Sequence, residues 1–194
     1  MLALLLIMAF SAVHPYDRPT WFMEVAPIFI ALPVMALTSR RFPLTTLLYV
    51  LVFIHALVLI AGGHYTYARV PLGFWMQDAL SLSRNPYDKI GHFMQGFVPF
   101  VAAREILLRN GYLSSRHMTA FLSICVVMAI SAWYELIEWW SALAMGQGAD
   151  EFLGTQGDPW DTQSDMLFAF IGATAAMLLL SPLHDSQMRR METK

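Results

Sequence analysis

The chain has 194 residues, of which 57% are hydrophobic and 13% are charged, and its formal net charge is −2. A soluble domain carries about a quarter charged residues, so this composition excludes one and indicates an integral membrane protein. The dispersed basic residues exclude a nucleic-acid-binding surface, and the single cysteine, Cys125, excludes an intrachain disulfide or a cysteine metal cluster.

We predict an all-α fold, a polytopic membrane helix bundle that forms a single transmembrane domain over residues 1–194. Six apolar segments, separated by Gly, Pro or charged residues, are predicted to form its helices. About 20 residues cross the hydrocarbon core, so the last four segments are long enough, whereas the first is short and is expected to be tilted or truncated. The segments cover residues 1–13, 21–37, 43–61, 86–108, 119–140 and 159–183.

The basic residues predict how this bundle is oriented, because they accumulate in cytoplasmic loops. If six helices alternate, three basic clusters fall on one side, which is then cytoplasmic together with both termini. The opposite side has two long connections, at 62–85 and 141–157, and the aromatic residues of the first indicate a short interfacial or re-entrant element. The clusters are Arg40 and Arg41, then Arg104, Arg109 and Arg116, then Arg189, Arg190 and Lys194.

Polar residues open the fourth segment, where Asn85 and Pro86 are expected to be the N-cap and the first helical residue. Asp88, His92 and Gln95 follow at spacings of four and three residues, so they form one stripe of a helix. Lys89 lies beside this stripe.

The fifth and sixth segments add carboxylates at their non-cytoplasmic ends. Glu135 and Glu138 share one helix face just before Trp139 and Trp140. In the sixth segment, Asp158 before Pro159 has the pattern of an N-cap and first helical residue. Asp161 falls in the first turn, where the helix dipole favours an anion, and Asp165 lies on the same face four residues later.

The depth of these groups is estimated from a helical rise of about 1.5 Å per residue. His92, Glu135 and Asp165 each lie about 8 to 9 Å inward, whereas Asp88, Lys89, Glu138 and Asp161 form a shallower layer. We therefore expect His92, Glu135 and Asp165 to converge as a catalytic and metal-binding set. Lys89, Glu138 and Asp161 are predicted to contact substrate. Ionisable groups inside membrane helices are functional hypotheses by default.

Carboxylates and an imidazole without sulfur suit a divalent metal ion such as Mg²⁺, Mn²⁺, Zn²⁺ or iron. The leading hypothesis is a metal-assisted enzyme of the bacterial inner membrane, acting on a membrane lipid, a lipid-linked precursor or an envelope component. The alternative is a cation- or ligand-binding or transport protein without catalysis, and a third possibility is a purely structural role for the charges. A conduit is disfavoured because mostly Ala, Gly, Met, Leu and Val lie below the carboxylates.

Structural interpretations stand beside these functional ones. His92 and His55 also suit interhelical packing, Glu135 and Lys89 suit a salt bridge, and Asp158 suits a cap alone. Glu24 is equally compatible with capping and with the cluster. Small residues at Gly96, Gly172 and Ala176 predict close helix contacts, Arg104 and Glu105 are expected to be snorkelling anchors, and four histidines are expected to be solvated. These four are His14, His64, His117 and His184.

Three motifs resemble the YjdF-like family of uncharacterised bacterial inner-membrane proteins, and the resemblance covers most of the chain. They are YDKIGHFMQGF at 87–97, YELIEW at 134–139 and GTQGDPWDTQSD at 154–165. The motif order resembles, more distantly, the VanZ-like family associated with glycopeptide resistance. Glu138 departs from that pattern, which usually has glutamine there. The residues that match it are Asp88, Lys89, His92, Phe93, Glu135 or Glu138, Asp161, Asp165 and Gly172.

Overall fold

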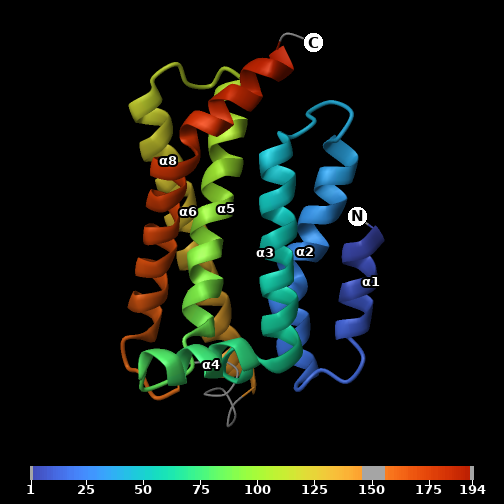
Figure 1. Ribbon diagram of the computed structural model, residues 1–194, viewed down its shortest axis with the longest axis vertical. Coiled ribbons are helices and arrows are strands. Elements are labelled where there is room, and N and C mark those ends of the chain that lie inside the picture. The colour runs from blue at the N-terminus through green and yellow to red at the C-terminus, as the bar shows by residue number, and fades with distance from the viewer. Residues whose placement is uncertain (1, 146–155, 193–194) are drawn as a thin grey trace.

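The computed structural model describes residues 2–145 and 156–192, and within them it contains seven α-helices, a 3-10 helix and no β-strand (Figure 1). The all-α prediction is therefore confirmed for the described residues. Each of the six predicted segments is helical. The helices are α1 (Leu2–Ser11), α2 (Arg18–Thr38), α3 (Thr46–Tyr65), η1 (Tyr67–Arg69), α4 (Pro71–Leu80), α5 (Tyr87–Arg109), α6 (Arg116–Met145) and α8 (Asp161–Glu192).

Four of these helices, α2, α3, α6 and α8, are long and apolar enough to cross a membrane. Their outward faces carry many large exposed apolar side chains, as expected for surfaces in contact with lipid. α1 has 10 residues and spans about 15 Å, roughly half of a hydrocarbon core. The first segment is thus a helix shorter than a full span, as its short apolar run indicated.

α5 is the central helix of the bundle and packs against α3, α6 and α8 (Figure 1). It has 23 residues but includes charged side chains at both ends, and it is not among the four apolar spans. Its neighbours bury most of these charges, which makes a polar helix tolerable within the bundle. The buried charged residues are Asp88, Arg104 and Glu105.

Two glycines set the closest helix contact, between α5 and α8. A Cβ atom at Gly96 would overlap the backbone carbonyl of Ala169, and one at Gly172 would overlap that of Phe93. The contact is thus reciprocal, and the prediction that both glycines permit close approach is confirmed. Apolar side chains continue it into a core that includes Val98, Phe100, Val101, Val127, Ala169, Ala173 and Ala176.

The bundle has two ends that differ in composition. We call one the α4 end, where α4 lies and where α5 and α8 start, and the other the C-terminal end, where α8 finishes (Figure 1). The short element predicted within 62–85 is η1 and α4. Of the connection predicted at 141–157, residues 141–145 belong to α6, and residues 146–155 lie outside the described part of the chain.

Both predicted N-caps differ in detail from the structure. α8 starts at Asp161, and Asp158 instead accepts a hydrogen bond from the backbone N of Trp160, 2.9 Å away. Its other oxygen lies 3.1 Å from Arg84, so ion pairing replaces capping. α5 starts at Tyr87, one residue later than expected, although the Asn85 side chain accepts from the Tyr87 backbone N at 3.0 Å.

Candidate functional site

The first turn of α5 is held in place by Asn85, which is almost completely buried. Its side-chain nitrogen donates to the carbonyl of Val70 at 3.1 Å, and Gly73 is required beside it because a Cβ there would overlap the amide. The Gln156 side chain donates to the Asn85 carbonyl at 3.0 Å and accepts from the Asn85 backbone N at 3.2 Å. This pairing ties the segment before α8 to the start of α5.

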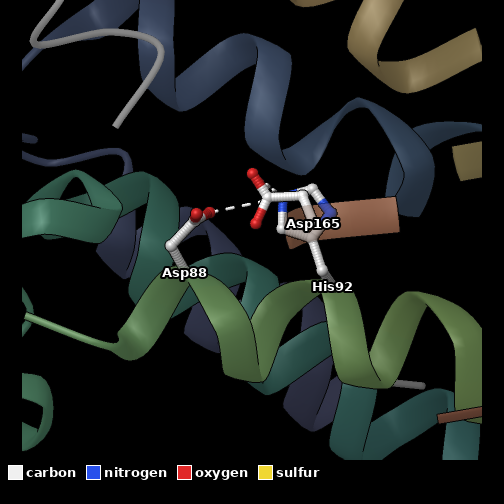
Figure 2. Close-up of side chains that lie close together, drawn as sticks. All are labelled: Asp88, His92 and Asp165. Carbon is white, nitrogen blue, oxygen red and sulfur yellow. Dashed lines mark ion pairs between the residues drawn. The ribbon is translucent and has the colours of Figure 1, made fainter. Parts of the chain in front are cut away.

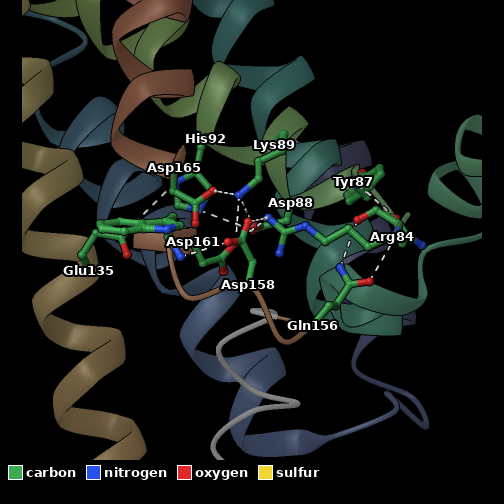
Figure 3. Close-up of polar contacts among 12 residues, drawn as sticks. Arg84, Tyr87, Asp88, Lys89, His92, Glu135, Gln156, Asp158, Asp161 and Asp165 are labelled. Carbon is green, nitrogen blue, oxygen red and sulfur yellow. Dashed lines mark hydrogen bonds and ion pairs between the residues drawn. The ribbon is translucent and has the colours of Figure 1, made fainter. Parts of the chain in front are cut away.

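Lys89 is the centre of the charged groups that face each other across α5 and α8 (Figure 3). Its ammonium lies 2.5 Å from Asp165, 2.9 Å from Asp161 and 3.7 Å from Asp88. The two predicted depth layers therefore merge, because the long lysine side chain reaches the deeper carboxylate. We call Arg84, Asp88, Lys89, His92, Glu135, Asp158, Asp161 and Asp165 the acidic cluster.

Arg84 closes the acidic cluster on its solvent side. Its guanidinium donates to Asp161 at 2.7 Å and lies 3.1 Å from Asp158. Burial alone would lower the pKa of Arg84, but the hydrogen bond to Asp161 and the charges of Asp161 and Asp158 raise it. The group is therefore a fixed positive charge that offsets part of the negative charge of the carboxylates, as its position just before the helix suggested.

His92 is buried and presents its two ring nitrogens to different partners. Nε2 lies 3.4 Å from Asp88 and 3.7 Å from Asp165, and Nδ1 lies 3.2 Å from Gln95 and 3.9 Å from Glu135. The predicted convergence of His92, Glu135 and Asp165 is thus found, but with Glu135 on the opposite side of the imidazole from Asp165. A tautomer that donates from Nδ1 to Gln95 leaves the Nε2 lone pair facing two carboxylates.

Three buried side chains form a group that could hold a metal ion, namely Asp88, His92 and Asp165 (Figure 2). One ligand atom from each lies within 4.8 Å of the others. The predicted metal-binding set was His92, Glu135 and Asp165. In the structure Asp88, which was predicted to lie in the shallower layer, replaces Glu135 in this set. The reason is geometric: an imidazole offers one nitrogen to a metal, and the nitrogen that faces Glu135 is the other one.

Two carboxylate oxygens of the acidic cluster are buried without a hydrogen-bond partner among the described residues. They are Asp88 Oδ2 and Glu135 Oε1. Buried polar atoms are nearly always satisfied, and unsatisfied carboxylate oxygens are costly. An unpaired acceptor of this kind marks a position where a cation, a water molecule or a substrate proton would be stabilised.

A cavity of about 120 Å³ adjoins the acidic cluster between α2, α3, α5 and α6. Glu138, the third predicted contact residue, lines it together with Asp88 and His92. Four cavity residues were not expected there or were left undecided: Glu24, His55, Tyr67 and Tyr134. His55 was predicted to serve in packing or hydrogen bonding. Its Nε2 has no hydrogen-bond partner among the described residues, so this ring nitrogen is available to a group in the cavity.

Tyr134 forms the wall of the cavity on the side of α2 and α6. Its hydroxyl donates to Glu24 at 2.9 Å, which links the two helices. The sequence feature that could have identified Tyr134 is helical spacing, because it lies four residues before Glu138 and shares its face.

Tyr67 is fixed by Gly62 and Gly91, where a Cβ would overlap its ring. Burial, together with the nearby Glu24 and Asp88, raises the pKa of Tyr67 well above its ordinary value, so this phenol stays protonated.

The comparisons with known proteins identify relatives of the whole chain. It is 58% identical to the inner membrane protein YjdF of Escherichia coli (strain K12) over 189 residues, which cover 97% of this chain and 90% of that protein. No solved structure matches. This relative is not a VanZ-like protein, so the distant resemblance to the VanZ-like family stays a prediction.

The predicted location in the bacterial inner membrane agrees with this relative and with the four apolar helices. A family model described as "Predicted membrane protein (DUF2238)" matches residues 1–186. The chain therefore belongs to this membrane-protein family.

Proposed function

We propose that the protein is a metal-assisted enzyme that acts, at the α4 end, on a membrane lipid or a lipid-linked envelope substrate. The observation that carries the proposal is the buried group of Asp88, His92 and Asp165 beside a cavity inside the bundle. Charged groups at this depth are expensive, so a catalytic or binding role accounts for them better than packing does.

The donor set of two carboxylates and one imidazole suits Mg²⁺, Mn²⁺, Zn²⁺ or iron. A bound divalent ion would supply a Lewis acid and lower the pKa of a coordinated water molecule. Asp88, His92 and Asp165 would hold it, and Gln95 would orient the imidazole through Nδ1. Glu135 would act as acid or base, because its Oε1 is buried and has no hydrogen-bond partner among the described residues.

Lys89, Arg84 and Glu138 would contact the substrate. The two cations lie on the solvent side of the group, where they would bind an anionic part of the substrate such as a phosphate. Asp161 holds both of them, at 2.9 Å from Lys89 and 2.7 Å from Arg84, and so would position them. Glu138 lines the cavity from the side of α6.

An apolar groove supports a lipid substrate. The cavity of about 120 Å³ is smaller than the several hundred Å³ of a typical ligand site. A groove of about 730 Å³ between α2 and α6 adjoins it, and the two share Pro27, Ile130 and Tyr134 as lining residues. A lipid chain would lie in this groove while the reacting group passes Tyr134 into the cavity.

The orientation is also proposed, from the same rule on basic residues. The C-terminal end carries Arg40, Arg41, Arg109, Arg116, Arg189 and Arg190, and would be cytoplasmic together with both termini. The α4 end would then face the periplasm, and the six-span count would require α1 to complete a crossing. Reporter fusions after Arg41, Arg116 and Lys194 should report inside, and fusions within 62–85 and 141–157 outside. An external C-terminus would move the site to the cytoplasmic face.

The decisive experiment compares Asp165→Asn with Asp78→Asn, an exposed carboxylate of α4 at the same end. Each purified protein is stripped with a chelator and titrated with Mn²⁺ and with Zn²⁺ by calorimetry. We expect Asp165→Asn to be produced at near normal levels but to bind at least about tenfold more weakly, and Asp78→Asn to bind normally. Equal affinity in the two variants would contradict the metal assignment.

Catalysis is tested separately, by incubating the metal-loaded protein with inner-membrane lipid extract and identifying changed lipids by mass spectrometry. We expect a product with the natural protein and with Asp78→Asn, and none with Asp165→Asn, His92→Gln or Glu135→Gln. If metal binds but no lipid changes, the catalytic part of the proposal fails.

A second candidate is cation binding or transport without catalysis, which the charge balance favours. Seven carboxylates lie in the acidic cluster and its cavity, against the fixed charges of Lys89 and Arg84. Beyond His55, however, the next cavity toward the C-terminal end is lined by apolar side chains such as Leu32, Val52 and Ala102. The test measures cation flux into proteoliposomes that contain the protein. A flux that is abolished by Asp165→Asn would favour this candidate over the enzyme. The carboxylates are Glu24, Asp88, Glu135, Glu138, Asp158, Asp161 and Asp165.

A further inference from the structure

A second cavity, at the C-terminal end, has the opposite charge. It has a volume of about 430 Å³ and lies between α5, α6 and α8. We call it the basic cavity, because three arginines and a histidine line it, with one carboxylate. These residues are Arg104 from α5, Arg116 and His117 from α6, and Arg189 and Asp185 from α8.

Asp185 positions two of the arginines. One of its oxygens lies 2.5 Å from Arg104, and the other lies 3.3 Å from Arg116. Arg104 also donates to Nδ1 of His184 at 3.1 Å, so this guanidinium is held on two sides and is only 7% exposed. A buried guanidinium fixed in this way is preorganised for an incoming anion.

The charges around the basic cavity do not cancel. Arg104 and Arg116 share Asp185, so these two guanidiniums and one carboxylate leave a net charge of +1 before Arg189 and His117 are counted. A phosphate diester, with one negative charge and acceptor oxygens, matches both this charge and the bidentate geometry of arginine. A cation is excluded as the ligand by the same balance.

The position of the basic cavity points to the source of the phosphate. Arg116 is the first residue of α6, which is long and apolar enough to cross the membrane, and its side chain is 76% exposed. It therefore lies where a transmembrane helix meets the lipid headgroups. Basic pockets between transmembrane helices at this depth bind anionic phospholipid headgroups.

We infer that the basic cavity binds the phosphate of an anionic phospholipid from the leaflet that surrounds the C-terminal end. Arg116 and Arg189 would contact the phosphate directly, and Arg104 would line the floor. The inference is independent of the proposed function, since no residue of the acidic cluster contributes.

The test titrates the purified full-length protein in detergent with short-chain phosphatidylglycerol, phosphatidylcholine or inorganic phosphate, and counts bound molecules by native mass spectrometry. We expect a clear preference for phosphatidylglycerol over phosphatidylcholine. Arg116→Gln and Arg189→Gln should each weaken it about fivefold, the effect of about 1 kcal/mol per basic residue. Arg41→Gln, an exposed arginine at the same end that does not line the cavity, should not change it.

Three outcomes would overturn the inference. The first is equal binding of the two lipids, and the second is the same loss in Arg41→Gln as in the cavity variants. The third is displacement of phosphatidylglycerol by millimolar inorganic phosphate that itself depends on Arg116 and Arg189, which would indicate a free-phosphate site. Asp165→Asn should retain phosphatidylglycerol binding, which separates this test from that of the proposed function.

Discussion

The molecule buries two groups of charged side chains, one at each end of α5, and they are built differently. At the C-terminal end, Glu105 is completely buried, and both of its oxygens accept two hydrogen bonds each. At the α4 end, Asp88 and Glu135 each retain a buried oxygen without a partner among the described residues. We call the group at the C-terminal end the arginine network; it comprises Thr45, Arg104, Glu105, Arg109, His184 and Asp185.

For the buried carboxylates, Glu105 at one end and Asp88 and Glu135 at the other, this difference separates a structural role from a functional one. In the arginine network, Arg109, Thr45 and His184 satisfy Glu105, and the carboxylate lies at the N-terminus of α3, where the helix dipole favours it. A fully satisfied buried network rigidifies a structure, whereas an incompletely satisfied one costs stability. Proteins retain such a cost mainly at functional sites.

The largest effect is expected from Glu105→Ala, which leaves His184, Arg109 and Thr45 without their shared acceptor. Removing one partner of a buried ion pair costs about 3–5 kcal/mol, so the variant should be poorly produced or melt far below the natural protein. The measurement is thermal unfolding of purified protein in detergent. If Glu105→Ala melts normally, the arginine network is not what holds this end together, and the contrast between the two ends fails.

Thr45→Val should have an intermediate effect. The Thr45 hydroxyl donates to Glu105 at 2.7 Å and caps α3 by accepting from the Leu48 backbone N at 3.4 Å. Loss of one hydrogen bond and one cap should lower the free energy of unfolding by about 1–3 kcal/mol. Thr45→Ser, which keeps the hydroxyl, is the matched control for the same melting experiment and should recover most of that stability.

The smallest effect on stability, and the sharpest contrast, is expected from Glu135→Gln. Because Glu135 Oε1 has no hydrogen-bond partner among the described residues and lies as far as 3.9 Å from His92 Nδ1, its neutral isostere should change the unfolding free energy by less than about 1 kcal/mol, in either direction. Function should nevertheless be lost, as measured by complementation of a deletion strain together with the amount of protein in the membrane. A Glu135→Gln protein that is degraded would place the acidic cluster with the structural networks.

The sequence was sufficient to predict the helices and much of the acidic cluster. Helical periodicity, together with the estimated depth of each residue along its helix, correctly predicted that His92, Glu135 and Asp165 lie close together. Periodicity could not show which nitrogen of His92 faces which carboxylate, because ring orientation depends on Gln95 and on packing. The depth estimate also ignored the length of the Lys89 side chain, which reaches Asp165. The shallower and deeper layers were therefore predicted to be more separate than they are.

The arginine network was missed because each member was interpreted alone. Arg104 and Glu105 near a helix end suggested snorkelling anchors, and His184 after an apolar run suggested a solvated residue. Both interpretations are wrong: these side chains are 7%, 0% and 1% exposed, respectively. The cause is the continuation of α8 beyond Pro182, which carries His184 and Asp185 across the end of α5 (Figure 1). A proline inside a helix bends it but does not always end it.

The central position of α5 has a consequence for how the chain is assembled in the membrane. α5 carries Lys89 and His92 into the interior of the bundle, and the aspartates that pair with Lys89 come from α8, more than 70 residues later. Until α8 has been synthesised, Lys89 lacks the two aspartates of α8 that pair with it, and a charged residue at membrane depth costs about 2.5–3.5 kcal/mol on insertion scales. Stable integration of α5 therefore depends on α8, which is synthesised after it, and a nascent chain that stops before Asp161 should be recognised by membrane quality control as unassembled.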